Sequence, residues 1–296
     1  MKNRIIVGII GIPLLIILII LGGWYLFGLV FVLSNICIWE LINIFSKKGA
    51  TPIKSLSYIW NSIFIISIFL ILFYGGNYSG IPAMGILIVL LLLNSLLHFG
   101  INLWNKAPNN TINISTGITN FSYITLFFSS VICISLFNEF GEIFLNLNLL
   151  SLIQINEINW NYVLLSMFIS IWSSDTFAYF IGRKIGKHKL FERISPKKSW
   201  EGAIAGFVGA VVGFTIPIYY LTPNFNFILS IIIGIVIGIV GPIGDLAESQ
   251  LKRDAGIKDS SNLIPGHGGL LDRFDSMLFA APSILIVLII YFYFSN

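Results

Sequence analysis

The side chains best suited to chemistry lie near the C-terminus, in the stretch KRDAGIKDSSNLIPGHGGLLDRFD at 252–275. This stretch is polar, charged and rich in glycine, although it separates two long apolar runs. Asp272, Asp275 and Ser276 follow an i, i+3, i+4 pattern, which places them on one face of a helix. A carboxylate at a helix N-terminus is favourable in itself, so either aspartate alone has a structural explanation. Two aspartates with Arg273 between them favour a site that binds metal and phosphate.

The segment PGHGG, just before these acids, is suited to a close backbone contact with a ligand. Gly266, Gly268 and Gly269 permit positive φ angles and lack a side chain that would hold a ligand away. His267 between them either contacts a phosphate or only shapes the loop.

A second polar stripe precedes this stretch, in GPIGDLAESQLKRD at 241–254. Asp245, Glu248, Ser249 and Lys252 are spaced i, i+3, i+4 and i+7, so a helix carries them on one face. Carboxylate oxygens are hard ligands of the kind that Mg²⁺ prefers. The structural alternative is a solvated helix face in which Glu248 pairs with Lys252, a contact that stabilises a helix by only about 0.2–0.5 kcal/mol.

Asp175 lies inside the apolar run 160–182. A carboxylate within a membrane is costly unless it is paired or faces water, and such groups usually mark functional sites. A structural carboxylate capped by Ser173, Ser174 or Thr176 is the alternative. The basic tail GRKIGKHKL that follows either anchors the helix end by snorkelling or attracts an anionic headgroup or phosphate.

The segment ISPKKSWEG at 194–202 predicts the start of a helix, with Ser195 as N-cap and Pro196 in the first turn. Lys197 and Lys198 would then lie near a helix N-terminus, where cations oppose the macrodipole. An anion bound at that terminus would satisfy both the backbone donors and the lysines. A pair of lysines that only sets membrane orientation is the alternative.

The composition identifies the elements that must position these residues. The chain of 296 residues is 56% hydrophobic and 10% charged, with a mean hydropathy of +0.91, which is typical of a membrane protein. Each apolar run is near the length that a membrane-crossing helix requires. We therefore predict an all-α, polytopic helical protein with about nine transmembrane helices. The candidate spans are 5–21, 23–45, 56–74, 81–101, 118–137, 160–182, 202–221, 227–244 and 277–294.

The basic residues predict the orientation. All 17 Lys and Arg residues fall in segments that nine spans with a cytoplasmic N-terminus would place in the cytoplasm. The opposite loops, including the one with Glu139, Glu142 and Glu157, carry none, as the positive-inside rule requires. The net charge of +4 thus reports orientation, and no nucleic-acid partner is expected. The polar stretches face the cytoplasm, where nucleotides are found.

The acidic residues divide the chain functionally. Of the 13 Asp and Glu residues, nine lie at or after Asp175. We predict a transmembrane scaffold at 1–159 and a catalytic transmembrane region at 160–296, with cytoplasmic loops at 183–201 and 245–276. Carboxylates that hold Mg²⁺, cations that neutralise phosphate and flexible glycines together suit a site that joins a nucleotide to a lipid.

These motifs resemble a known family. SQLKR from Ser249, KD from Lys258, PGHGG and then DRFD from Asp272 are similar to the signature of the phosphatidate cytidylyltransferases, the CDP-diacylglycerol synthases. SSDTFAYFIGRKIGKHKL and ISPKKSWEG are similar to further segments of that family, in the same order. The resemblance covers about 172–276. Upstream, Glu40 occupies a position in the second span where the family often carries an acid.

The resemblance implies a fold, a reaction and a set of roles. It implies a polytopic helical protein of the bacterial cytoplasmic (inner) membrane, a homodimer, that uses Mg²⁺, one or two cations, to join CTP and phosphatidate into CDP-diacylglycerol and pyrophosphate. Asp245 and Asp272 would be the principal metal ligands, with Glu248 and Asp275 near them. The catalytic set would be Asp245, Asp272, Lys252 and Arg273. The substrate-binding set would be Asp175, Lys197, Lys198, Ser249, Arg253, Lys258, His267, Gly268 and Gly269.

Elementary chemistry agrees with this reaction, and two other functions remain as alternatives. The phosphate of phosphatidate is already anionic, so its attack on the α-phosphorus of CTP needs no strong general base. A CTP-dependent polyprenol kinase would need the same Mg²⁺ and nucleotide. A membrane transporter would be expected to carry inverted repeats and polar residues in both halves, which the sequence does not display.

Overall fold

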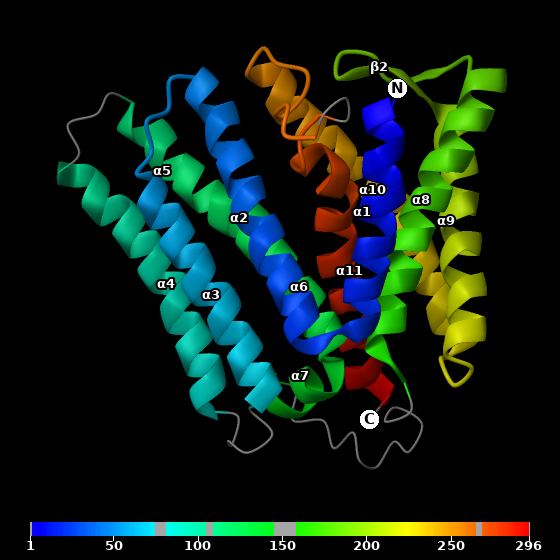
Figure 1. Ribbon diagram of the computed structural model, residues 1–296, viewed down its shortest axis with the longest axis horizontal. Coiled ribbons are helices and arrows are strands. Elements are labelled where there is room, and N and C mark those ends of the chain that lie inside the picture. The colour runs from blue at the N-terminus through cyan, green and yellow to red at the C-terminus, as the bar shows by residue number, and fades with distance from the viewer. Residues whose placement is uncertain (1, 75–80, 105–108, 145–157, 265–267, 296) are drawn as a thin grey trace. The chain divides into compact units, whose positions relative to one another are not determined.

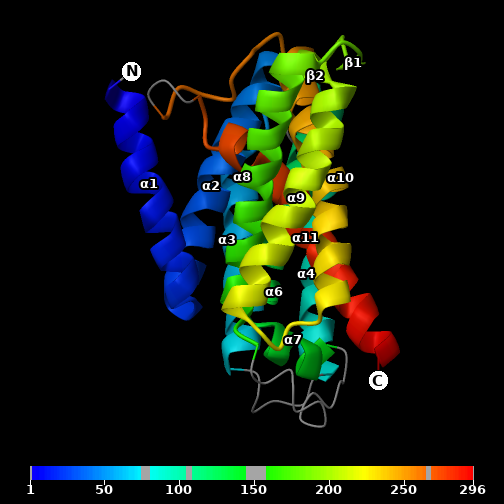
Figure 2. The ribbon, with the colours of Figure 1, turned by 90° about the vertical axis from the view of Figure 1, so that its right-hand side faces the viewer.

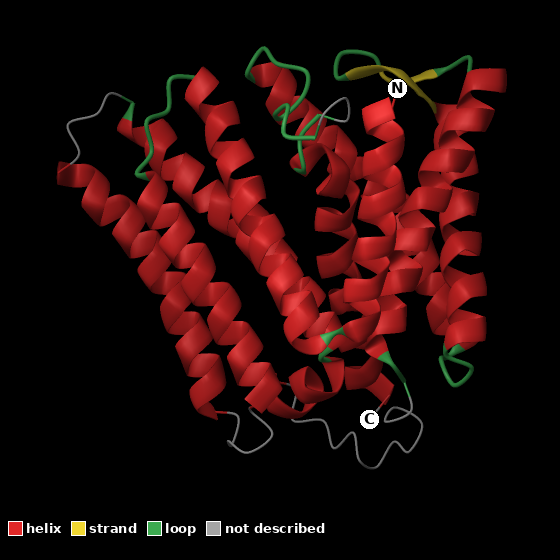
Figure 3. Cartoon of the chain, in the orientation of Figure 1, coloured by secondary structure: helices red, strands yellow, loops and turns green. Residues whose placement is uncertain are grey.

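The computed structural model describes residues 2–74, 81–104, 109–144, 158–264 and 268–295 (Figure 1). Almost all of the described chain is helical, and one two-stranded antiparallel sheet is drawn in yellow in Figure 3. The chain forms two compact units. The first unit consists of Met1–Asn146 with Leu251–Arg273, and the second of Leu147–Gln250 with Phe274–Asn296. The predicted division into scaffold and catalytic region stays a prediction.

Eight helices in the described ranges are long and apolar enough to cross a membrane. The protein is therefore a multi-pass membrane protein with a nearly all-α fold, as predicted. The first predicted span corresponds to α1 (Lys2–Leu21), whose residues Ile9–Leu21 form a shorter apolar helix. The predicted break before the second span is confirmed, because Gly22 and Gly23 have φ angles of 60° and 48°.

The first unit contains the helices of the N-terminal half. They are α1, α2 (Gly23–Lys47), α3 (Lys54–Tyr74), α4 (Ile81–Trp104), α5 (Asn110–Thr119), the π-helix η2 (Asn120–Thr125), α6 (Leu126–Ser135) and α7 (Phe137–Phe144). Aromatic side chains pack α2 against α3, with ring centroids 4.5 Å apart for Phe27 and Phe69. Figure 1 shows α3 and α4 lying side by side.

A chain of buried, uncharged polar groups links the helices of this unit. Asn61 Nδ2 of α3 donates to Ser34 Oγ of α2 at 3.0 Å, and Thr125 Oγ1 of η2 donates to Asn61 Oδ1 at 2.9 Å. Asn120 Nδ2 donates to Ser57 Oγ at 3.3 Å. Such hydrogen bonds hold membrane helices together, because lipid offers the same groups no partner.

The second unit carries the basic hairpin. Its elements are α8 (Trp160–Ile185), β1 (Lys189–Phe191), β2 (Ser195–Ser199), α9 (Trp200–Leu221), most of α10 (Phe227–Asp254) and most of α11 (Leu271–Ser295). Figure 2 shows α8 and α9 running side by side. A Cβ at Gly206 would lie 3.0 Å from Ser174 O, and one at Gly209 would lie 2.9 Å from Ser173 O. These glycines let the two backbones approach closely, as small residues do at membrane helix interfaces.

The predicted helix start at Ser195 is wrong. Ser195 begins β2, and α9 begins only after Ser199, whose hydroxyl accepts a hydrogen bond from the third residue of the helix at 3.2 Å. The physical reason lies in Pro196, because the residue before a proline is biased towards extended backbone. Lys197 and Lys198 therefore lie on a strand that leads into the helix, and not in its first turn.

Candidate active site

A cavity of about 690 Å³ opens in the second unit among α8, the β1–β2 hairpin, α9 and α10. Small residues, among them Gly182, Gly202 and Gly206, line it together with charged side chains. The charged residues that line it are Asp175, Arg183, Lys189, Lys197, Lys198 and Asp245. Four cations thus surround a space of the size that small-molecule sites usually have. An anionic ligand is the kind of molecule that this lining would bind.

Helix α8 supplies two of these groups. Asp175 lies ten residues before Ile185, where α8 ends, which is about 15 Å along the helix axis. The Asp175 side chain is exposed and lines the cavity, so it faces an open space, as a carboxylate within a span requires. Arg183, two turns further along the same helix, lines the cavity nearer its basic end.

The hairpin and α10 meet at an ion pair. Lys198 Nζ of β2 lies 2.6 Å from Asp245 Oδ2, with the two side chains 27% and 33% exposed. Ser249 Oγ, one turn along α10, donates to Asp245 Oδ1 at 3.2 Å. Both carboxylate oxygens of Asp245 are thereby held in a fixed orientation. A partly exposed pair adds only about 0–1 kcal/mol to stability, so orientation is its larger effect.

The four residues of the predicted polar stripe, Asp245, Glu248, Ser249 and Lys252, do lie on one helix, α10. Their surroundings differ. Asp245 lines the cavity and Glu248 is fully buried. Asp275 belongs to the second unit and accepts a hydrogen bond from Ser276 N at 2.6 Å. Neither Glu248 nor Asp275 lines the cavity in the part of the chain that the structure describes.

A second carboxylate centre lies in the first unit. Asp272 Oδ1 accepts a hydrogen bond from Lys252 Nζ, and both side chains are about nine-tenths buried. Asp272 Oδ2 accepts from Gly269 N at 2.8 Å, from Ser260 N at 3.0 Å and from Ser260 Oγ at 3.1 Å. The first residues of α11 and the loop before it therefore close around this aspartate.

Glu40 belongs to the same carboxylate centre. From the sequence, only the family resemblance indicated an acidic residue at this position, and its contacts were not predicted. It is fully buried in α2 and accepts hydrogen bonds from the hydroxyls of Ser260 and Ser261 at 2.9 and 2.6 Å. The amides of Leu270 and Leu271 donate to it at 2.8 and 2.6 Å. The sequence feature that indicates a role for Glu40 is its position as a single carboxylate inside a span. Such a group is stable there only with hydrogen-bond or ionic partners.

The remaining predicted site residues between 253 and 273 include three exposed cations. Arg253 is exposed and donates to Ile257 O at 3.0 Å, and Lys258 and Arg273 are also exposed. Gly268 has a φ of 78°, which confirms the expected positive angle. His267 and Gly266 lie outside the described residues.

The donor chemistry suits a hard cation such as Mg²⁺, which is usually held by one or two carboxylates together with substrate phosphates. Within the described ranges, no three histidine, cysteine, aspartate or glutamate side chains are grouped as a metal site built from protein alone would require. Asp245 is paired with Lys198 in the second unit, and Asp272 with Lys252 in the first. Shared coordination of one cation by the two aspartates stays a prediction.

Comparison with known proteins gives consistent matches. A sequence model described as "Cytidylyltransferase family" matches residues 2–292. The phosphatidate cytidylyltransferase of Staphylococcus haemolyticus is 43% identical over 128 residues, which are 43% of this chain and 49% of that protein. That of Haemophilus influenzae is 46% identical over 125 residues, 41% of this chain and 43% of that protein. The matched segment thus spans about half the length of these curated relatives.

Proposed function

Because the chain belongs to the cytidylyltransferase family, we propose that it transfers the cytidylyl group of CTP to phosphatidate. The products are CDP-diacylglycerol, a precursor in phospholipid biosynthesis, and pyrophosphate. Relatives named phosphatidate cytidylyltransferase support this substrate pair. The observation that carries the proposal is the cavity of about 690 Å³, in a unit of membrane-crossing helices, lined by four cations and two carboxylates.

The reaction needs charge neutralisation more than it needs acid–base chemistry. A phosphate oxygen of phosphatidate attacks the α-phosphorus of CTP and forms a new P–O bond. The bond from the α-phosphorus to the oxygen that bridges to the β-phosphorus breaks, and pyrophosphate leaves with that electron pair. Both reactants are anions, so fixed cations that hold them together and offset developing charge lower the barrier.

The cations that line the cavity support this proposal. Arg183 and Lys189 reach it from the end of α8 and from β1, and Lys197 and Lys198 reach it from β2. A guanidinium and three ammonium groups match the oxygens of phosphate groups. When a phosphate enters, the Lys198 ammonium can shift its contact from Asp245 to the ligand, which exposes a carboxylate oxygen of Asp245.

We assign the binding of one or two Mg²⁺ ions to Asp245 and Asp272, with Glu248 and Asp275 as neighbouring carboxylates. Each of these two aspartates is paired with a lysine, Asp245 with Lys198 in the second unit and Asp272 with Lys252 in the first. A metal ion held by these carboxylates would supply positive charge that neutralises phosphate oxygens. Lys252 and Arg273 would then contact phosphate oxygens on the Asp272 side.

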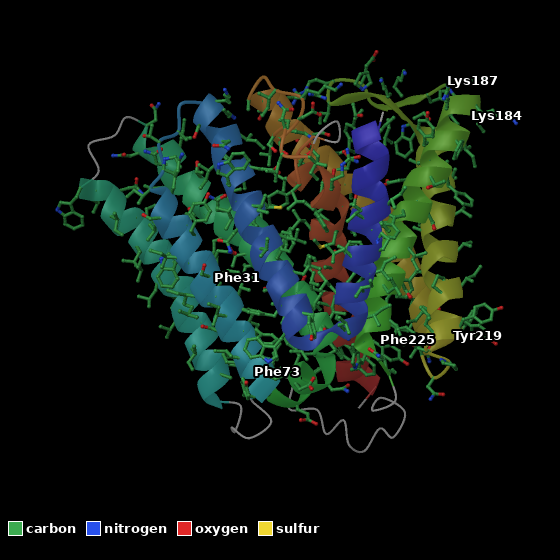
Figure 4. The ribbon with its side chains drawn as sticks, viewed as in Figure 1. Phe31, Phe73, Lys184, Lys187, Tyr219 and Phe225 are labelled. Carbon is green, nitrogen blue, oxygen red and sulfur yellow. The ribbon has the colours of Figure 1, made fainter. Side chains whose placement is uncertain are left out.

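The orientation of the second unit fits a reaction at the cytoplasmic surface. Figure 4 labels Lys184 and Lys187 at one end of the α8–α9 pair, and Tyr219 and Phe225 at the other end. Basic residues mark the cytoplasmic end of membrane helices. The cavity is lined by residues near the basic end, which supports a site on the inner face of a bacterial cytoplasmic membrane, where CTP is available. The protein is proposed to act there as a homodimer.

A turnover assay on the purified protein tests this proposal. Phosphatidate and Mg²⁺ are supplied in detergent with CTP, ATP or GTP in parallel, and pyrophosphate release is measured. Release that requires both CTP and phosphatidate is the expected result. Consumption of CTP with a polyprenol in place of phosphatidate would contradict the proposal and support a kinase. No turnover with either acceptor would support the transporter alternative.

A further inference from the structure

Glu40 is a carboxylate with no exposed surface inside a membrane-crossing helix. An ionised group in that position is stable only if hydrogen-bond donors surround it. Among the residues that the structure describes, its four hydrogen-bond donors are Ser260, Ser261, Leu270 and Leu271, more than 200 residues further along the chain than Glu40 itself. The contacts of Glu40 therefore indicate a role in the first unit beyond the stability of its own helix α2.

Two of these donors are the amides at the start of α11. The first N–H groups of any helix lack an acceptor within the helix, and a side-chain oxygen of the residue just before the helix normally supplies one. Here Leu270 N and Leu271 N donate to Glu40 Oε1 and Oε2, at 2.8 and 2.6 Å. The negative charge also lies at the positive end of the helix dipole. Glu40 thus caps α11 from a distant helix.

The fit around this cap is tight. A Cβ placed on Gly269 would lie 2.5 Å from Glu40 Oε1 and 1.8 Å from Ser260 Oγ, so only glycine is accommodated there. The two serines complete the cap, with Ser260 on Oε2 and Ser261 on Oε1. Each carboxylate oxygen accordingly receives one hydroxyl and one amide.

Ser260 connects this cap to Asp272. Its hydroxyl oxygen lies 2.9 Å from Glu40 Oε2 and 3.1 Å from Asp272 Oδ2. A hydroxyl has one proton and can donate it to only one carboxylate at a time. Asp272 Oδ2 also accepts from the amides of Ser260 and Gly269, so it stays satisfied when the hydroxyl turns to Glu40. Glu40 and Asp272 are held by one shared set of loop atoms.

We propose that Glu40 is a positioning residue: it fixes the carboxylate of Asp272 by capping α11 and by holding Ser260. The inference rests on the proposed function in one respect, namely that Asp272 takes part in cytidylyl transfer. The capping itself is independent of the reaction and has its own measurement.

Hydrogen exchange at single amides measures the cap directly. Glu40→Gln keeps the shape of the side chain but replaces one acceptor oxygen by an NH₂ group that faces donors. In the purified full-length protein, the amides of Leu270 and Leu271 should exchange at least about tenfold faster, as expected for the loss of hydrogen bonds to a charged group. Amides of α8 should be unaffected. The matched control is Ser46→Ala on the same helix, whose hydroxyl donates to Ile42 O. Unchanged exchange at Leu270 and Leu271 would overturn the proposal.

Kinetics then separate positioning from general stability. Glu40→Gln should lower kcat for cytidylyl transfer by about 10–100-fold, the usual effect of removing a group that orients a metal ligand. The KM for CTP should change much less. Ser261→Ala removes one donor to Glu40 and no contact to Asp272, so it should lower kcat by a smaller factor. This variant also tests the proposal if Glu40→Gln does not fold. Partial recovery of kcat in Glu40→Asp, which restores the charge, is also expected.

The outcomes are distinguishable. Faster exchange at Leu270 and Leu271 with unchanged kcat would refute positioning, as would a loss of protection spread evenly over the whole chain. If the wild-type protein shows no cytidylyl transfer, the proposed function fails, while the exchange data still decide whether Glu40 caps α11.

Discussion

Lys198 on strand β2 and Asp245 on helix α10 form an ion pair of 2.6 Å at the lining of the cationic cavity. The pair connects a hairpin to a membrane-crossing helix, and Ser249 fixes the other oxygen of the same carboxylate. The proposed mechanism uses both partners, because the lysine would contact a phosphate and the aspartate would bind Mg²⁺. Each partner can therefore be tested by its own substitution.

Lys198→Met should reduce kcat/KM for cytidylyl transfer by about 10–100-fold, since a charge-assisted hydrogen bond contributes about 1.5–3 kcal/mol. Methionine keeps much of the length of the side chain and removes only the charge. Lys184→Met is the matched control, because Lys184 lies near the end of α8 and is not among the residues that line the cavity. Equal activity of the two variants would argue against a phosphate contact at Lys198.

Asp272→Asn should lower activity by at least about 100-fold, because it removes the charge that a cation and Lys252 both require. The protein should still insert and fold, since an amide oxygen can accept from Gly269 N and Ser260 N in place of the carboxylate. Steady-state turnover and the thermal midpoint in detergent are the measurements. Full activity in a folded Asp272→Asn protein would end the metal assignment.

Removal of divalent cations should abolish turnover, and added Mg²⁺ should restore it. Two anionic substrates repel each other unless a cation bridges them, so the fixed lysines alone should be insufficient. Chelation followed by titration with Mg²⁺ measures this dependence, with Asp245→Asn expected to need a higher Mg²⁺ concentration. Turnover that persists at full rate after chelation would contradict the proposal.

Gly206→Val should lower the free energy of unfolding by about 1–3 kcal/mol, because a Cβ there would lie 3.0 Å from Ser174 O and force α8 away from α9. The thermal midpoint reports the change. Gly85→Ala on α4 is the control, because a Cβ at that position meets no atom within 4 Å. A midpoint unchanged by Gly206→Val would mean that the α8–α9 contact is not tight.

Asn61→Leu should lower the free energy of unfolding by about 1 kcal/mol, in the range measured for hydrogen bonds between membrane helices. It removes the contacts to Ser34 and Thr125 together and leaves a hydroxyl at each position without that partner. Ser122→Ala is the control, since Ser122 is exposed and donates within its own segment to Ile118 O. A stability equal to that of the control would show that the polar chain is not stabilising.

The spans could be predicted from the sequence because hydrocarbon forces every backbone group into a helix, so apolar length alone identifies the helices. The α1–α2 break was also predictable, since Gly22-Gly23 is the one place where two long apolar runs meet without a polar loop. The positions of Asp175, Lys197, Lys198 and Asp245 around one cavity depend on tertiary packing. Their residue types suggested a shared chemistry, but no spacing could assign them to a common space.

Two features show where sequence reasoning failed. At Ser195-Pro196 the sequence motif predicted a helix start, but the structure has a strand. The residue before proline prefers an extended backbone, and this conformation allows antiparallel pairing with Lys189–Phe191. At Glu40 the sequence shows a carboxylate in a span but does not identify its partners, since contacts over more than 200 residues leave no local pattern. The structural alternative for the α10 stripe, a pair between Glu248 and Lys252, did not include Asp272, with which Lys252 pairs across the loop.

The most direct measurement follows the phosphorus atoms of CTP. Wild-type protein is incubated with phosphatidate, Mg²⁺ and CTP that carries a radiolabel on either the α- or the γ-phosphate, and the lipid is then extracted. Cytidylyl transfer predicts that the α-label enters the lipid and that the γ-label stays in the aqueous phase as pyrophosphate. Label from the γ-phosphate in the lipid, with none from the α-phosphate, would contradict the account.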